Sequence, residues 1–206
     1  MSLDTYPKTV RLKGNRTAVI RPLQKDDFER LLSFFRSLPD DGRMYLRHDV
    51  TDPELIRKWT AEMDLEHVIP LVAVEGDTIA ADGTLHIASR GWARHVGHIR
   101  LVVGPSHRRL GVGTVIAREL VDLAEERKLE KLQAHVIENN IGAVRMFERL
   151  GFEKAAVLKD MVKDQNGRNQ NLAVMINDVA RLSQIMEDWI QDSMMPAYRA
   201  PGEGYS

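Results

Sequence analysis

Apolar residues recur along this chain with two different spacings, one typical of strands and one typical of helices. Short apolar or alternating runs bounded by turn residues favour strands, whereas apolar residues three and four positions apart favour helices. The strand-like runs cover residues 9–12, 17–21, 69–74, 79–87, 97–103, 131–137, 152–162 and 172–176. The helical spacing covers residues 28–38, 53–63, 113–127, 141–150 and 179–191. The pattern therefore predicts a mixed α/β chain.

Turn residues indicate how these elements connect. Residues 14–15, 75–77 and 164–167 are turn-forming and each separates two strand-like runs, which predicts three hairpins. The centre of the chain, by contrast, alternates strand, helix, strand, helix and strand. Because a helical crossover returns the chain in the same direction, this part predicts at least two parallel strands.

Composition sets limits on the class of protein. The chain has 206 residues, a formal net charge of -1 and no cysteine. This length suffices for one domain with its own core, and a near-neutral chain has no overall field that favours nucleic acid or membrane. The lack of cysteine excludes disulfides and thiolate zinc sites and fits a reducing compartment. With no apolar run long enough for a bilayer and no signal-like start, we expect a soluble, cytoplasmic protein that binds neither membrane nor nucleic acid.

The most informative segment, residues 102–114, joins an apolar run to a helical pattern through a basic, glycine-containing loop. The first N–H groups of a helix and its positive dipole end both favour anions. Gly111 and Gly113 let the backbone approach a ligand closely, and Arg108 and Arg109 add charge-assisted donors. The segment therefore predicts a site for a diphosphate.

Two motifs carry a resemblance to a known family. The pattern R-x-x-G-x-G at residues 108–113 resembles the acetyl-CoA signature of the GNAT N-acyltransferase superfamily. The pattern N-x-x-A-x-x-x-F-x-x-x-G-F at residues 140–152 resembles the second motif of that family, one helix and one strand later. The resemblance covers residues 9–178 and implies a single GNAT-like domain with a mixed, mostly antiparallel sheet flanked by helices. It leaves residues 179–193 as a C-terminal helix and 194–206 as an expected flexible tail.

The resemblance also implies how acetyl-CoA would bind. Two central parallel strands would splay apart, and the backbone of Leu101 and Val103 would pair with the pantetheine arm in the gap. The N–H groups of residues 109–114 would hold the diphosphate, Asn140 would bond the arm, and Ala143 and Phe147 would line its far wall. The residues expected to bind acetyl-CoA are Leu101, Val102, Val103, Arg108, Arg109, Leu110, Gly111, Val112, Gly113, Thr114, Asn140, Ala143 and Phe147.

Direct transfer to an amine needs a base, a donor for the oxyanion and a route for the leaving thiolate. His98 is the expected base, because it precedes the thioester position on a strand where relatives often have an acid or histidine, and Arg100 shares its expected face. The N–H of Leu101 or Val102 is the expected oxyanion donor. Many relatives have tyrosine as the acid where this chain has Phe147, which cannot donate a proton. Tyr45, in the loop of residues 39–49, is a candidate donor.

Several of these residues also have an ordinary structural interpretation. The glycines could simply form a tight turn, the two arginines could be solvated, and Asn140 could be only the N-cap of its helix. His98 would face the other side of the sheet if the strand register differed by one residue. Phe147 also leaves open a module that binds acyl-CoA as a sensor without turnover.

The sequence says less about metals and partners. His95 and His98, without cysteine or a matching acidic pair, do not make a metal site, so we expect no metal. The acceptor is open between small-molecule and protein amines, and the sequence leaves the oligomeric state open, a homodimer included.

Overall fold

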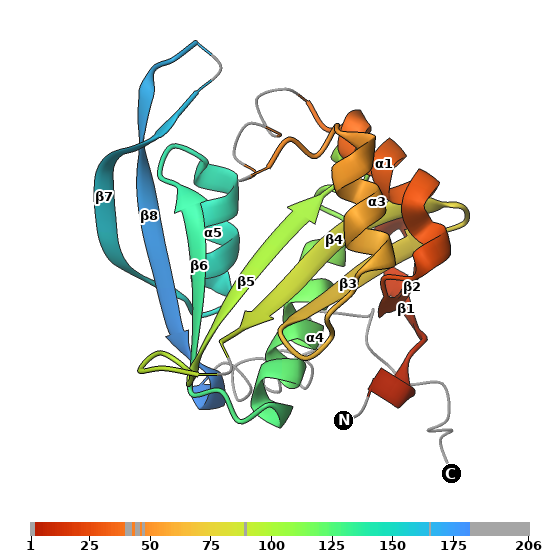
Figure 1. Ribbon diagram of the computed structural model, residues 1–206, viewed down its shortest axis with the longest axis horizontal. Coiled ribbons are helices and arrows are strands. Elements are labelled where there is room, and N and C mark those ends of the chain that lie inside the picture. Colours follow the sequence, from red (N-terminus) through yellow and green to blue (C-terminus); the bar gives the residue numbers. More distant parts are fainter. Residues whose placement is uncertain are drawn as a thin grey trace.

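The computed structural model describes residues 3–39, 43, 46, 48–88, 90–164 and 166–181. Within this part of the chain, eight strands form one sheet in the order β1-β2-β3-β4-β5-β6-β8-β7 (Figure 1). The strands are β1 (Lys8–Leu12), β2 (Arg16–Pro22), β3 (Val68–Glu75), β4 (Thr78–Ile87), β5 (Val96–Val103), β6 (Lys131–Ile137), β7 (Glu153–Lys163) and β8 (Asn169–Asp178). The β5–β6 pair is parallel and the other neighbouring pairs are antiparallel.

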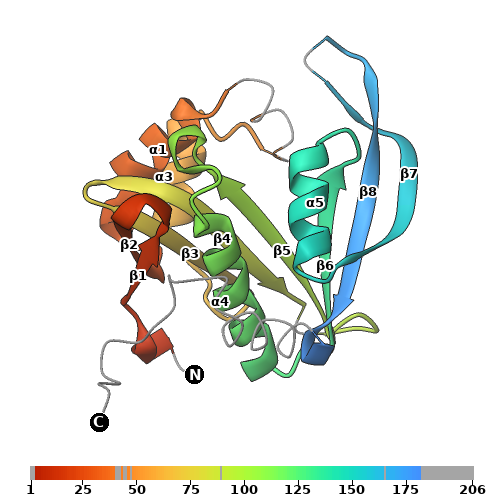
Figure 2. The same ribbon diagram turned by 180° about the vertical axis from the view of Figure 1, so that it is seen from behind.

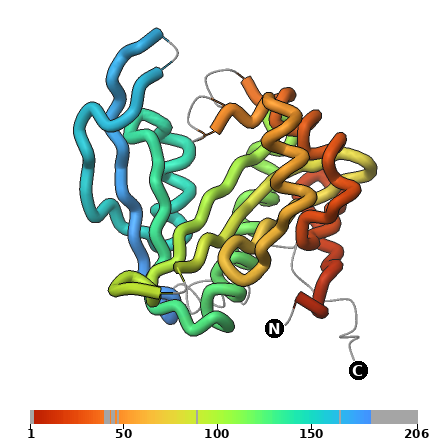
Figure 3. Tube along the Cα trace, viewed as in Figure 1, coloured from red at the N-terminus to blue at the C-terminus, as the bar shows by residue number. Residues whose placement is uncertain are grey.

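Helices cover both faces of the sheet. The helices are α1 (Phe28–Ser37), α3 (Pro53–Ala61), α4 (Val112–Glu126) and α5 (Ile141–Arg149). Helices α1 and α3 lie on one face, seen in Figure 1, and α4 and α5 lie on the other, seen from behind in Figure 2. The tube in Figure 3 shows the β7–β8 hairpin projecting beyond the rest of the domain.

The sequence predictions hold for the order and type of these elements. The predicted mixed α/β fold, the hairpins and the parallel pair are all present. Strand β8 begins at Asn169 rather than at the apolar residue Leu172, because pairing with β7 extends to Lys163↔Asn169. Most of the helix predicted at residues 179–191, and the tail after it, lie outside the described residues.

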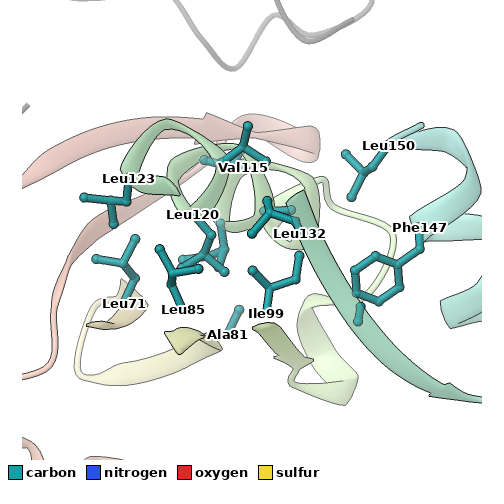
Figure 4. Packing of buried hydrophobic residues seen from close by; sticks show 14 of the residues in the cluster. Leu71, Ala81, Leu85, Ile99, Val115, Leu120, Leu123, Leu132, Phe147 and Leu150 are labelled. Carbon is teal, nitrogen blue, oxygen red and sulfur yellow. The ribbon is translucent and has the colours of Figure 1, made fainter. Parts of the chain in front are cut away.

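The two faces have separate apolar cores. One cluster lies between the sheet and α4 and α5; in Figure 4, Leu85 and Ile99 point from adjacent strands toward Leu120 of α4. The other, here called the α1/α3 cluster, lies between the sheet and α1 and α3, and includes Phe35, Ile56 and Val72. Amphipathic helices on each face of one sheet thus fix the strands from both sides.

The N-terminal hairpin is attached to α4 through a buried carboxylate. Glu119 accepts hydrogen bonds from the Tyr6 hydroxyl at 2.8 Å and from Lys8 Nζ at 2.6 Å. Nearby, burial raises the pKa of Asp122 to about 6 despite the charge of Arg118. In the described part of the chain, no helix is both long and apolar enough to cross a membrane.

Gly83 sets how closely α4 packs on the sheet. A Cβ atom there would overlap Cγ2 of Ile116 and lie 3.1 Å from Cδ1 of Leu120, both in the buried core. We expect Gly83→Ala to lower the free energy of unfolding by about 1–3 kcal/mol, because the packed core cannot yield to an added methyl group. Urea unfolding measures this. The control Gly142→Ala, in the exposed first turn of α5 where the nearest atom lies 3.8 Å away, should be neutral or slightly stabilising.

Candidate functional site

Strands β5 and β6 pair only near their start. The register contains Val96↔Lys131, Gly97↔Leu132 and His98↔Gln133 and goes no further. Beyond this point β5 stays paired with β4 up to Val103, and β6 stays paired with β8 up to Ile137. The two strands therefore diverge, as Figures 1 and 2 show, and their facing main-chain edges are not bonded to each other.

The direction of the main-chain groups on β5 follows from one hydrogen bond. The Gly104 N–H donates to the Ala80 carbonyl at 2.9 Å. Because an antiparallel ladder alternates, the N–H groups of Val102 and Arg100 also point toward β4, and those of Leu101 and Val103 point to the edge facing β6. A ligand lying between the strands would thus meet the main chain of Leu101 and Val103, whereas Val102 presents only its side chain to the α1/α3 face.

The turn after β5 presents bare main-chain donors. Gly111 has a φ of 95° and Arg109 a φ of 63°, both in the left-handed region. The first hydrogen bond of α4 runs from Val115 N–H to the Gly111 carbonyl, and no side chain caps the helix. The N–H groups of Val112, Gly113 and Thr114 therefore have no partner within the helix, and the exposed side chains of Arg108 and Arg109 lie beside them.

Gly113 keeps this helix start close to the strand end. A Cβ atom there would lie 3.1 Å from Cγ2 of Val103 and 3.5 Å from Sδ of Met146. The absence of a side chain lets α4 approach both β5 and α5, so the bare donors sit next to the diverging strands.

The turn is held from behind by residues that sequence reasoning did not find, here called the Glu75 brace: Arg16, Glu75 and His107. The Glu75 carboxylate lies 2.8 Å from His107 Nε2 and accepts a hydrogen bond of 2.8 Å from Arg16 Nε. The Arg16 hydrogen bond, with help from His107, holds the pKa of Glu75 below its usual value. Arg16 also donates to the Ser106 carbonyl at 3.3 Å, and the Lys13 N–H donates to the Leu110 carbonyl at 3.0 Å.

The second motif forms the start and the inner face of α5. The Asn140 carboxamide oxygen accepts a hydrogen bond from the Ala143 N–H at 3.2 Å, so Asn140 is the N-cap of this helix. Phe147 is 5% exposed and packs edge-to-face on Phe152 with ring centroids 5.1 Å apart. It therefore belongs to the core, while Ala143 is half-buried beside it.

A polar row lies on the sheet face opposite α4. The register of β4 and β5 places the side chains of this polar row on one face: Asp82, Thr84, His86, His98 and Arg100. Val102 lies on the same face, opposite Asp82. His98 is exposed, and its ring lies 5.9 Å, centroid to centroid, from that of His135 on β6. The sequence could not decide which face of the sheet His98 occupies. The register places it on the face that α1 and α3 cover. Tyr45 lies outside the described residues.

Asp82 is a residue that the sequence analysis missed. Burial raises the pKa of its carboxyl group to about 7, against the opposing charge of Arg100. The signal was present in the sequence as a lone acid among the apolar and small residues of the strand at 79–87. Among the described residues, no three histidine or acidic side chains gather as metal ligands would.

Comparisons with known proteins agree with this geometry. Residues 28–152 match the model of the acetyltransferase (GNAT) family. A probable N-acetyltransferase, YjcK, of Bacillus subtilis is 29% identical over 74% of this chain and 88% of its own length. The [ribosomal protein bS18]-alanine N-acetyltransferase of Escherichia coli is 26% identical over 37% of this chain and 51% of its own length. A putative acetyltransferase from Salmonella typhimurium, solved with its cofactor acetyl-CoA, has the same fold, with a TM-score of 0.67, 19% identity and coverage of 79% of this chain and 94% of that one.

Removal of the brace should loosen the turn without unfolding the domain. In Glu75→Gln the charge that binds Arg16 and His107 is lost, so we expect amide hydrogen exchange at residues 108–114 to speed up by about tenfold, the factor for a loss of about 1.4 kcal/mol. Hydrogen-exchange mass spectrometry measures this. Glu138→Gln is the matched control, because Glu138 binds Lys154 and Asn171 on other strands and should leave exchange in this turn unchanged.

Proposed function

This chain belongs to the GNAT family of acetyltransferases, and we propose that it transfers an acetyl group from acetyl-CoA to a primary amine by direct attack in a ternary complex. The observation that carries the proposal is the open edge of β5 leading into the uncapped start of α4. An extended pantetheine arm can pair with the open edge of β5, and a diphosphate can accept hydrogen bonds from the N–H groups at the start of α4.

The residues of the two motifs have complementary parts in binding acetyl-CoA. The main chain of Leu101 and Val103 is proposed to pair with the pantetheine arm. The N–H groups from Arg109 through Leu110 and Gly111 to Thr114, with the Arg108 and Arg109 side chains, are proposed to bind the diphosphate. Across the gap, α5 would form the far wall through Ala143 and Asn140, whose amide nitrogen remains available beside its capping oxygen.

Transfer requires a neutral amine, because an ammonium ion has no lone pair with which to attack. The Leu101 N–H is the proposed oxyanion donor, since it points to the open edge while the Val102 N–H points to β4. His98, on the face shared with α1 and α3, is proposed as the base. Phe147 has no hydroxyl to protonate the thiolate, so Tyr45 stays the proposed acid.

The acceptor is proposed to approach from the side of α1 and α3, where the polar row lies. One relative acts on an alanine of a ribosomal protein, which keeps protein amines beside small-molecule amines as candidates. A cytoplasmic location is part of the proposal, because a chain without cysteine fits a reducing compartment.

Thiol release tests the proposed reaction directly. On addition of acetyl-CoA and a panel of primary amines that includes amino acids, polyamines and N-terminal peptides, we expect free CoA thiol to form only with an accepted amine. A thiol-reactive dye measures the rate, and mass spectrometry identifies the acetylated product. Acetyl-CoA binding by calorimetry without thiol release from any amine would contradict transfer and favour the acyl-CoA sensor.

The role of His98 has its own test. We expect His98→Ala to lower kcat on the order of a hundredfold and to change the pH profile, because a base that acts in the rate-limiting step supplies that much. The KM for acetyl-CoA should stay the same, and His67→Ala, a histidine bound to Asp64 outside the polar row, should have no effect. Near-normal turnover of His98→Ala with an unchanged pH profile would remove the assignment.

A further inference from the structure

The polar row contains a carboxylate that lies nearer to the proposed oxyanion donor than His98 does. We propose that Asp82 receives the ammonium group of the acceptor and takes its proton before attack on the thioester. This inference rests on the proposed function and divides the work of the proposed base between two residues: Asp82 takes the proton from the amine, and His98 relays it along the same face to solvent.

The register places Asp82 at the reacting end of the row. Asp82 is paired directly with Val102, whose neighbour Leu101 turns its N–H to the open edge. Side chains directly opposite in an antiparallel pair have Cβ atoms about 5 Å apart. His98 lies four residues before Val102, roughly 13 Å along the strand at the usual rise. Asp82 therefore lies one strand away from the proposed oxyanion donor and is nearer to it than His98, which would need a water chain to reach it.

The surroundings of Asp82 make it suited to a cation. On β3 it is paired with Val72, which is fully buried in the α1/α3 cluster, and Val102 on β5 packs against the same cluster. Asp82 itself is half-buried, and with the described residues its carboxylate makes no hydrogen bond or ion pair. A carboxylate that is partly removed from water and lacks a bound partner gains most from an incoming ammonium ion.

Asp27, on the same face of the sheet, shows what a structural carboxylate looks like in this protein. It is fully buried, and although burial opposes ionisation, bonds from Arg21, the Gln24 N–H and Arg30 hold its pKa below the usual value. The protein thus satisfies a buried acid completely where the acid serves the fold. Among the described residues Asp82 lacks such partners, and because it is half-buried its carboxylate oxygens stay open to water or to an incoming ammonium group.

The charges around Asp82 allow it to gain and lose a proton near neutral pH. The titratable and charged side chains on its face are Arg100 and His98 on β5, His86 on β4 and His135 beside His98 on β6, and Arg21 farther along the sheet is occupied by Asp27. From α1, Arg30 reaches Asp27, and the buried side chains that α1 and α3 contribute to the α1/α3 cluster are apolar. Burial raises the pKa of Asp82 to about 7, and Arg100 keeps it from rising further.

The proton balance of the step is simple. The acceptor ammonium gives one proton to the Asp82 carboxylate and becomes a neutral amine. Its lone pair forms the C–N bond to the thioester carbon, and the C–S bond then breaks with its electrons going to sulfur. The second proton, on the new amide nitrogen, replaces the one that the proposed acid gives to the departing thiolate, which leaves as CoA thiol. The proton on Asp82 leaves to solvent through His98.

The test compares Asp82→Asn with Asp77→Asn, which removes an exposed carboxylate from the adjacent turn. With the amine that gives the fastest thiol release, we expect Asp82→Asn to lower kcat/KM for the amine about 10²- to 10⁴-fold at pH 7. The deficit should shrink as the pH approaches the pKa of the amine, because the neutral amine then forms without a base. Acetyl-CoA affinity by calorimetry should not change, and Asp77→Asn should match the wild type.

Thermal unfolding gives a second measurement that needs no acceptor. Because the folded-state pKa is raised, Asp82 binds its proton more tightly in the folded than in the unfolded protein. Stability is therefore highest below the unfolded pKa and is lost as the pH rises through about 7. We expect Asp82→Asn to raise the melting temperature at pH 8 and to change it little at pH 4.

The outcomes separate the inference from the proposed function. Wild-type rates in Asp82→Asn, a rate loss that is the same at every pH, or a lower melting temperature at pH 8 would overturn the role of Asp82 alone. Failure of the wild type to release thiol with any amine would overturn the proposed function and this inference together. A pH-dependent loss with unchanged acetyl-CoA affinity would establish it.

Discussion

The divergence of β5 from β6 is the constraint on which the rest of the site depends. Main-chain groups in a sheet interior normally pair with the next strand, and leaving them unpaired is costly unless water or a ligand satisfies them. Here each strand is held on its other side, β5 by β4 and β6 by β8, so neither collapses onto the other. The same divergence opens the side of β5 next to the start of α4, which brings an extended edge and a set of bare helix donors into one place.

The position of the turn depends on contacts far away in the sequence. The Glu75 brace joins the ends of β2 and β3 to the turn that precedes α4, and the Lys13 N–H holds the Leu110 carbonyl. Within α4, Glu119 accepts hydrogen bonds from Tyr6 and Lys8 and so attaches the N-terminal strand to the helix. The turn before α4 is therefore not an independent loop. Its geometry is set by the N-terminal hairpin, which carries none of the family motifs.

The sequence predicted the parts of this molecule that local chemistry determines. The glycines at 111 and 113 specify a sharp turn into a helix, and the apolar runs specify where the strands on either side of it lie along the chain. It could not predict contacts between residues distant in the chain, such as Glu75 with His107, because no local pattern marks them. The sequence could not decide which face of the sheet His98 occupies, because a shift of the strand register by one residue would reverse it. Phe147 had two possible environments, and its packing on Phe152 places it in the core. Asp82 was missed because an acid within a strand is ordinarily assumed to face solvent.

In the described part of the chain, the sheet separates two apolar clusters, the core under α4 and α5 and the α1/α3 cluster. Substitutions in α1 and α3 therefore fall on the face of the sheet away from α4 and α5, the side from which the acceptor is proposed to approach. This partition places the proposed acceptor side and the proposed coenzyme turn on structures with separate cores. A domain built this way can change its acceptor side while it keeps the contacts proposed to hold the donor of the acetyl group.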